Sequence, residues 1–276
     1  MSNSDMSTRT GEGIAAAAPV RDKKPQSARK NQHVFSRYYY DRPGFVDGRT
    51  RFLRMCDSFV GNETILEIGA GPKNKTTAHF AARVPVIGLD VSEEVRENHW
   101  LTEAHVYNGE RFPFPDDSFQ LCVSDYVLEH VSNPQEHFQE IRRVLKPGGV
   151  FCFRTPNLWH YFTLGSRLMP HTLHLRLANW LRDLGSHAGD PYPTVYKANS
   201  RRAVRRFAKA AGLEVFKLET IEPEPSYGRA SLALFYPMMA YERLVNSSPR
   251  LAAFRDNLLG ALRKPVSVAG SSANCS

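Results

Sequence analysis

Cysteine is scarce in this chain. Four cysteines, Cys56, Cys122, Cys152 and Cys275, occur among 276 residues, and none forms a Cys-x-x-Cys pair. That spacing is typical of zinc sites and redox-active dithiols, so neither is indicated. We expect two of the cysteines to lie in core strands, which favours reduced thiols in a cytosolic protein.

Long apolar runs are also missing. Residues 230–241 are strongly apolar, but this run is too short to span a bilayer and Pro237 interrupts it. Residues 14–18 are too short and too weakly apolar to form the core of a signal peptide. We therefore expect a cytoplasmic protein. Residues 230–241 are expected to be buried against the domain, to line an apolar pocket or to rest on a membrane surface.

The sequence offers no recognisable set of metal ligands. His171 and His174 have the i, i+3 spacing of neighbours on a helix, but no cysteine or carboxylate completes a site with them. We expect these histidines to lie on a helix surface or in a pocket, and we predict no metal.

Length and composition indicate one large α/β domain. The chain is 42% hydrophobic and 23% charged, and residues 1–30 contain few large apolar side chains. These residues are predicted to be a disordered tail, followed by a single domain over 31–270 and a flexible end at 271–276. Insertions at 158–198 and 221–256 are expected to form a lid over a substrate.

Two apolar runs end in residues suited to binding a nucleoside. Ile65–Ile68 is followed by Gly69 and Gly71, and the run from Val84 to Leu89 is followed by Asp90. In nucleotide-binding α/β folds, a carboxylate after the second strand accepts hydrogen bonds from ribose hydroxyls while the glycine turn passes beneath the ligand. Both features predict a nucleoside site where parallel strands end.

The residues around the glycines narrow the choice of ligand. A dinucleotide site needs a third glycine and a free helix N-terminus for its pyrophosphate, but Pro72–Asn74 follows here. The carboxylate of Glu67 would repel a pyrophosphate and would suit an ammonium or sulfonium group. S-adenosylmethionine carries both groups, so it is the predicted cofactor.

The segment Glu67–Gly71 resembles the first motif of class I S-adenosylmethionine-dependent methyltransferases. Three further blocks follow in order, at residues 108–119, 125–131 and 144–149. Together they resemble the methyltransferases of ubiquinone and menaquinone biosynthesis, and the likeness covers about a third of the chain. The resemblance implies a Rossmann-like α/β fold with a mostly parallel seven-stranded sheet, flanking helices and helical lid insertions.

The spacing of apolar residues agrees with that fold. Phe119–Val123 predicts a buried strand, the helix after it begins at Asn133 or Pro134, and the next strand is Val150–Arg154. Residues 214–218 and 258–263 predict the sixth and seventh strands. Alternating strands and helices imply right-handed crossovers and a mostly parallel sheet.

The resemblance also implies which residues bind the cofactor. They are Glu67, Gly69, Ala70, Gly71, Asp90, Val91, Asn108, Gly109 and Asp125. Asn108 stands where the family usually has an aspartate that accepts from the adenine amino group, and an asparagine can accept only through its uncharged carbonyl oxygen. The alternative for Asp90 and Asn108 is a role as turn residues.

Catalysis in this family is attack by a substrate atom on the sulfonium methyl group, so the protein contributes mainly positioning. An attacking hydroxyl also needs a base. His130, five residues beyond Asp125, is the candidate. The alternative is that His130 braces the loop or the methionine carboxylate.

Substrate specificity is expected from the segments around the shared core. Tyr39, Tyr40, Trp159 and Tyr161 are the candidate substrate contacts. The two tyrosines before residue 41 lie where many relatives place an aromatic lid, although they could equally be packing residues with solvated hydroxyls.

The net charge of +8 raises the question of an anionic partner. Basic residues over 201–209 lie on one face of a predicted helix, a pattern usual for a solvated face but also able to meet phosphates. We expect a small-molecule substrate, no nucleic acid and a possible peripheral membrane contact, and the oligomeric state stays open. The leading hypothesis is methyl transfer to an oxygen of a metabolite, glycan intermediate or lipid-linked compound. The alternatives are an RNA- or protein-modifying methyltransferase and a non-catalytic nucleotide-binding protein of the same fold.

Overall fold

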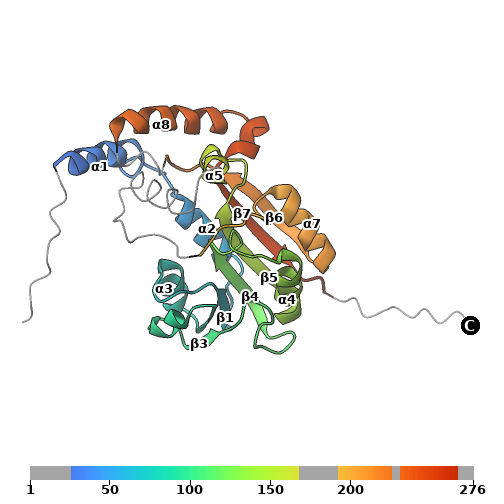
Figure 1. Cartoon of the computed structure of the whole chain (residues 1–276). Coiled ribbons are helices and arrows are strands. Elements are labelled where there is room, and N and C mark those ends of the chain that lie inside the picture. The colour runs from blue at the N-terminus through green and yellow to red at the C-terminus, as the bar shows by residue number, and fades with distance from the viewer. Residues whose placement is uncertain (1–25, 168–191, 226–230, 267–276) are drawn as a thin grey trace, which may run out of the picture.

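A seven-stranded sheet forms the centre of the molecule (Figure 1). The computed structural model describes residues 26–167, 192–225 and 231–266. The strand order is β3-β2-β1-β4-β5-β7-β6. The strands are β1 (Ile65–Ile68), β2 (Val86–Asp90), β3 (Glu103–Val106), β4 (Phe119–Asp125), β5 (Leu145–Pro156), β6 (Glu214–Ile221) and β7 (Asn257–Arg263).

The sheet is parallel except for β7, which runs antiparallel to both β5 and β6. This confirms the predicted fold class and all seven strands fall in one sheet. Because β7 is reversed, its first residue, Asn257, pairs with the last residues of β5 and β6, Pro156 and Ile221. The carboxyl ends of six strands and the start of β7 therefore share one edge of the sheet, where open α/β folds bind ligands.

Helices cover both faces of the sheet. On one face α4 (Pro134–Val144) and α7 (Arg201–Ala211) bury Phe138, Ile141, Val204 and Ala208 against the strands. On the other face α2 (Gly48–Asp57) and α3 (Lys75–Ala81) form part of a second apolar cluster. The parallel strands are buried on both faces, which explains their nearly continuous apolar sequences.

The ends of α7 follow from local chemistry. Ser200 Oγ accepts a hydrogen bond from the amide of Ala203 at 3.2 Å, and Gly212 ends the helix in the left-handed conformation with φ +74°. Ser200 thus caps the helix that the sequence predicted to start here.

Three further helices stand at the carboxyl edge of the sheet, and we call them the roof. They are α1 (Gln26–Tyr38), α5 (Tyr161–Arg167) and α8 (Leu232–Asn246), with the short helix η3 (Pro249–Phe254) after α8. In Figure 1, α1 and α8 lie side by side at the top. Phe35, Tyr39 and Phe235 form the apolar cluster between them.

Helix α1 overlaps the end of the predicted tail. The segment expected to be disordered ended at residue 30, but α1 already starts at Gln26, and its later residues Phe35 and Tyr38 contact the ring of Phe235 in α8. Tertiary contact stabilises a helix that local composition disfavours. Residues 1–25 and 168–191 lie outside the described ranges, so His171, His174 and much of the expected lid do too. Among the described helices, none combines the length and apolarity required to cross a membrane.

Candidate active site

The glycine turn after β1 has two glycines with different surroundings. Gly69 and Gly71 have φ angles of +75° and +57°, in the region that side chains disfavour. A Cβ on Gly69 would lie 2.2 Å from Val127 Cγ2, whereas a Cβ on Gly71 would meet no atom within 4 Å. Gly69 is therefore required for packing, while Gly71 faces open space in which a ligand can pass close to the backbone.

Side chains from three segments fix this turn. The Asp90 carboxylate accepts from the amide of Gly71 through Oδ2 and from that of Ser92 through Oδ1, both at 2.9 Å. The Asn98 amide donates to the carbonyl of Gly71 at 3.1 Å, and Asn74 donates to the carbonyl of Ala70. No motif in the sequence marked Asn74 or Asn98, because their role depends on the folded turn.

Glu67 lies beneath the turn and is 1% exposed. Its Oε1 accepts from Asn74 Nδ2 at 3.1 Å, while its Oε2 has no hydrogen-bond donor among the described residues. Burial raises the pKa of this carboxyl to about 8, and the nearby carboxylates of Asp125 and Asp90 add to the shift. A cationic ligand would relieve this cost, so the site fits the ammonium of S-adenosylmethionine.

The other side of Asp90 presents an apolar surface. Val91 is 45% exposed, and a Cβ on Gly109 (φ +86°) would lie 3.9 Å from Val91 Cγ1. Asn108 hydrogen-bonds within its own turn, since its Oδ1 accepts from the amide of Glu110 at 3.1 Å. This bond is typical of a turn residue, and the predicted contact of Asn108 with the adenine stays a prediction. Val91 and Gly109 lie beside each other with the valine side chain exposed.

Asp125 at the end of β4 belongs to a buried ion pair. Arg154 at the end of β5 donates from Nε and Nη2 to the two oxygens of Asp125, at 2.7 and 2.8 Å. Thr76 of α3 donates to the same carboxylate at 2.8 Å, and Arg154 is only 5% exposed. Asp125 therefore ties α3, β4 and β5 together. The sequence analysis missed Arg154, whose one signal was a lone arginine after an apolar strand.

Tyr126 links this ion pair to the start of β7. It has a φ of +61°, which is uncommon for an aromatic residue, and its ring lies under the Arg154 guanidinium at 4.5 Å. Its hydroxyl lies 2.6 Å from Asn257 Oδ1 and donates to it. A backbone conformation that costs energy is thus held by contacts with β5 and β7.

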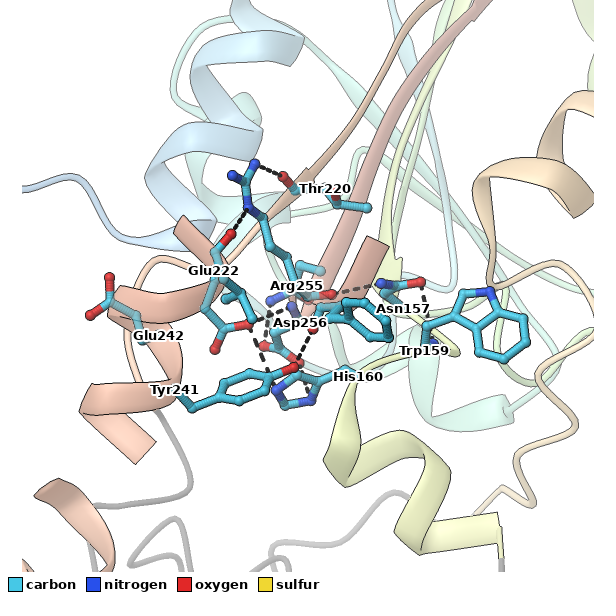
Figure 2. A network of polar contacts seen from close by, with 12 residues as sticks. Asn157, Trp159, His160, Thr220, Glu222, Tyr241, Glu242, Arg255 and Asp256 are labelled. Atoms are coloured by element: carbon cyan, nitrogen blue, oxygen red, sulfur yellow. Dashed lines mark hydrogen bonds and ion pairs between the residues drawn. The ribbon is translucent and has the colours of Figure 1, made fainter. Parts of the chain in front are cut away.

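A second polar cluster occupies the edge between β5, β6 and β7 (Figure 2). His160 Nδ1 lies 3.5 Å from Asp256 Oδ1, and its Nε2 lies 3.7 Å from Glu222 Oε2. Burial lowers the pKa of His160, while burial and the charge of Asp256 raise the pKa of Glu222 to about 9. Glu222 therefore takes up a proton more readily than an exposed glutamate.

The four candidate substrate residues all lie in or beside the roof. Tyr39 is buried and its hydroxyl donates to Glu242 at 3.1 Å, whereas Tyr40 is half-exposed and donates to Glu224 at 3.2 Å. Trp159 is exposed just after β5. The ring centroid of Tyr161 lies 4.2 Å from that of His160.

His130 lies in the loop after β4. Its Nδ1 is 3.1 Å from the carbonyl oxygen of Pro193, and its ring is 6.3 Å from that of Tyr192. The contact with Pro193 braces two loops against each other. A neutral imidazole has one donor and one acceptor nitrogen, so a histidine here can take part in proton transfer.

Comparison with known proteins identifies the family. Residues 66–153 match the model of a methyltransferase domain. An uncharacterised methyltransferase of Mycobacterium marinum is 27% identical over 210 residues, 69% of this chain and 78% of that protein. Another, from Mycolicibacterium vanbaalenii, is 38% identical over 95 residues, 32% of this chain and 36% of that protein. The chain is a class I S-adenosylmethionine-dependent methyltransferase.

Solved structures agree with this methyltransferase in fold. One is a methyltransferase of Haloferax volcanii in complex with the Trm112 activator, with a TM-score of 0.53, 18% identity and coverage of 86% of this chain and 94% of that one. A second, from Methanosarcina mazei, has a TM-score of 0.51, 16% identity and coverage of 77% and 97%. The fold implies S-adenosylmethionine as cofactor, and the likeness to ubiquinone-pathway enzymes stays a prediction.

Proposed function

We propose that this methyltransferase moves the methyl group of S-adenosylmethionine to an oxygen of a small molecule, such as a metabolite, a glycan intermediate or a lipid-linked compound. The observation that supports it most is the pairing of the open turn at Gly71 with the buried Glu67, whose Oε2 has no donor in the described part of the chain. A backbone that a ligand can approach lies above a carboxyl group that favours a cation.

Each half of the cofactor has a proposed partner in the chain. Glu67 binds the methionyl ammonium, Asp90 holds the ribose hydroxyls through its remaining lone pairs, and Val91 with Gly109 contacts the adenine. Asp125 acts through Arg154 and Thr76 by holding the strand ends in place. The cofactor supplies the activated methyl group, and positioning of this kind is worth up to about 7–11 kcal/mol.

His130 is the proposed base. The imidazole of His130, held near the Pro193 carbonyl through Nδ1, would accept the proton of an attacking hydroxyl. The same contact serves the alternative role of bracing the loop. Cofactor affinity and turnover separate these two roles.

The charge of the roof supports a small acceptor. Glu222, Glu224 and Glu242 are buried there, beside Asp256. These side chains are buried acids, which offer no binding site for the phosphates of RNA. The basic side chains of α7 lie on a helix that packs with α4 against one face of the sheet, away from this roof (Figure 1).

The first experiment is calorimetric titration with S-adenosylhomocysteine, beside NAD. The second uses S-adenosylmethionine labelled on its methyl group with phenols, carboxylic acids, lipid-linked sugars, peptides and RNA. Transfer to a small hydroxyl compound, lost in His130→Ala with the S-adenosylhomocysteine affinity retained, would support the proposal. Transfer to RNA or peptide alone, or loss of affinity in His130→Ala, would contradict it.

A further inference from the structure

The side of α8 that faces solvent is apolar. Its exposed residues are mostly uncharged and apolar, with two polar ones, Arg243 and Asn246, near the end of the helix; the others are Ala233, Tyr236, Pro237, Ala240 and Leu244. Tyr236 is 46% exposed and Leu244 is 59% exposed, while Phe235 and Val245 on the opposite side are buried. A surface helix ordinarily has charged and polar residues on the side that faces solvent.

The apolar surface continues onto the neighbouring elements. Tyr38 at the end of α1 is exposed, and its ring lies 6.3 Å from that of Tyr236. Phe254 at the end of η3 is also exposed. We call the exposed residues Tyr38, Tyr236, Leu244 and Phe254 the apolar face. Three elements of the roof contribute to the apolar face, and Tyr38 adjoins Tyr236 within it.

The exposed charges within α1, α8 and η3 have one sign. The sequence of α1 contains Arg29, Lys30, His33 and Arg37 and no acid. In α8 the one acid, Glu242, is buried beneath Tyr39, while Arg243 is exposed. Arg250 of η3 is exposed as well. Aromatic and aliphatic groups flanked by cations suit an anionic surface with an apolar interior.

We infer that the apolar face lies on the surface of a membrane that contains anionic phospholipid, with α1 and α8 in the interfacial plane. A second copy of the chain is a poorer partner. Two apolar faces packed against each other would bring the basic side chains of α1, α8 and η3 of both copies together. The 15 residues of α8 are too few to cross a bilayer, so the contact is peripheral. The inference does not depend on the proposed acceptor, although it would place the sheet edge close to lipid-linked compounds.

Vesicle sedimentation of the full chain tests this inference. The vesicles contain phosphatidylcholine alone or with about one third phosphatidylglycerol, at low and high salt. We expect binding to the anionic vesicles that weakens as salt rises, since each arginine near such a surface contributes about 1 kcal/mol, roughly fivefold in affinity. The double substitution Tyr236→Glu with Leu244→Glu should reduce binding by at least about tenfold.

The matched control is Phe216→Glu, on β6. Phe216 is exposed too, but it lies against Phe59 and Arg263 rather than in the roof. Binding that survives the roof substitutions, or no binding to anionic vesicles, would overturn the inference. So would a dimer in solution that the same two substitutions dissociate. All variants should bind S-adenosylhomocysteine as the parent does, so failure here is distinct from failure of the proposed function.

Discussion

The edge of the sheet has two parts, the proposed cofactor side and the proposed acceptor side. The contacts that build them join residues at very different separations in the sequence. On the cofactor side, Asn74 contacts Glu67 seven residues away, and Asp90 contacts Gly71 across 19. On the acceptor side, Tyr39 contacts Glu242 across 203 residues. The first set of contacts joins segments that are near each other in the sequence, whereas the second forms only when the start and the end of the domain meet.

The two halves also differ in charge. The cofactor side has one carboxyl without a full set of partners, Glu67, which a single cation would satisfy. The acceptor side holds several buried acids, and two of them are bonded by tyrosines from the start of the domain. This contrast suggests that cofactor binding and roof assembly can be perturbed separately.

The largest effect is expected at the ion pair between the two halves. Arg154→Met would leave the largely covered carboxylate of Asp125 without its partner, and breaking a buried pair typically costs about 3–5 kcal/mol. Urea denaturation measures this change in unfolding free energy. Arg142→Met is the control, because Arg142 is exposed and makes a single long bond to the Gly212 carbonyl. Equal stability of the two variants would show that the pair does not join the halves.

A pair of glycine substitutions tests the cofactor side. Gly69→Ala adds a clash with Val127 to an unfavourable φ and should cost about 2–4 kcal/mol of unfolding free energy. Gly71→Ala has only the φ penalty, about 1–2 kcal/mol, but its Cβ would enter the ligand's space. We therefore expect the Gly71 variant to fold and to bind S-adenosylhomocysteine weakly. Parent-like affinity in that variant would argue against a ligand above this turn.

Asp90→Ala should weaken the binding of S-adenosylhomocysteine by about 1–3 kcal/mol, because the carboxylate is proposed to hold the ribose. The substitution also removes the acceptor for the amide of Gly71, so Asp90→Asn is the matched variant, since it keeps an acceptor of similar shape. Titration calorimetry gives both affinities. Unchanged affinity in both variants would remove Asp90 from the site.

The raised pKa of Glu67 predicts the direction of two pH effects. Its pKa of about 8 lies above the unfolded value, so unfolding releases a proton and this group's contribution to stability falls as pH rises from about 4.5 to 8. A cationic ligand needs the carboxylate, so S-adenosylhomocysteine should bind more weakly as pH falls below about 8, by up to about tenfold per unit. Binding calorimetry in buffers of different ionisation enthalpy would detect the proton that Glu67 releases when the ligand binds. The same proton release in Glu67→Gln would contradict the assignment.

The smallest effects on stability are expected for two adjacent tyrosines that follow α1, Tyr39 and Tyr40. Tyr39→Phe removes a buried bond to Glu242 and should cost about 1–2 kcal/mol of unfolding free energy. Tyr40→Phe removes a half-exposed bond to Glu224 and should cost about 0.5 kcal/mol or less. Thermal denaturation of both variants, run side by side, measures the difference. A larger loss for Tyr40 would mean that the roof packs differently from this structure.

Much of the fold was predictable because its signals are local. The apolar runs at β1, β2 and β4 and the capped helix α7 each depend on neighbouring residues, and all were found where expected. The start of α1 was missed, because its stability comes from Phe235, some two hundred residues away. Arg154 was missed for the same reason, since its partner Asp125 lies on another strand.

The sequence by itself indicated the class of cofactor and the fold that implies it, because the glycines that need positive φ and the acid after the second strand follow two consecutive strands. Only the tertiary structure decided what surrounds that site. It assigned Asn108 to its turn, paired Asp125 with Arg154, and brought Tyr39 and Glu242 together. The physical reason is that local backbone geometry is encoded in a few adjacent residues, whereas burial and pairing depend on which distant surfaces pack against each other.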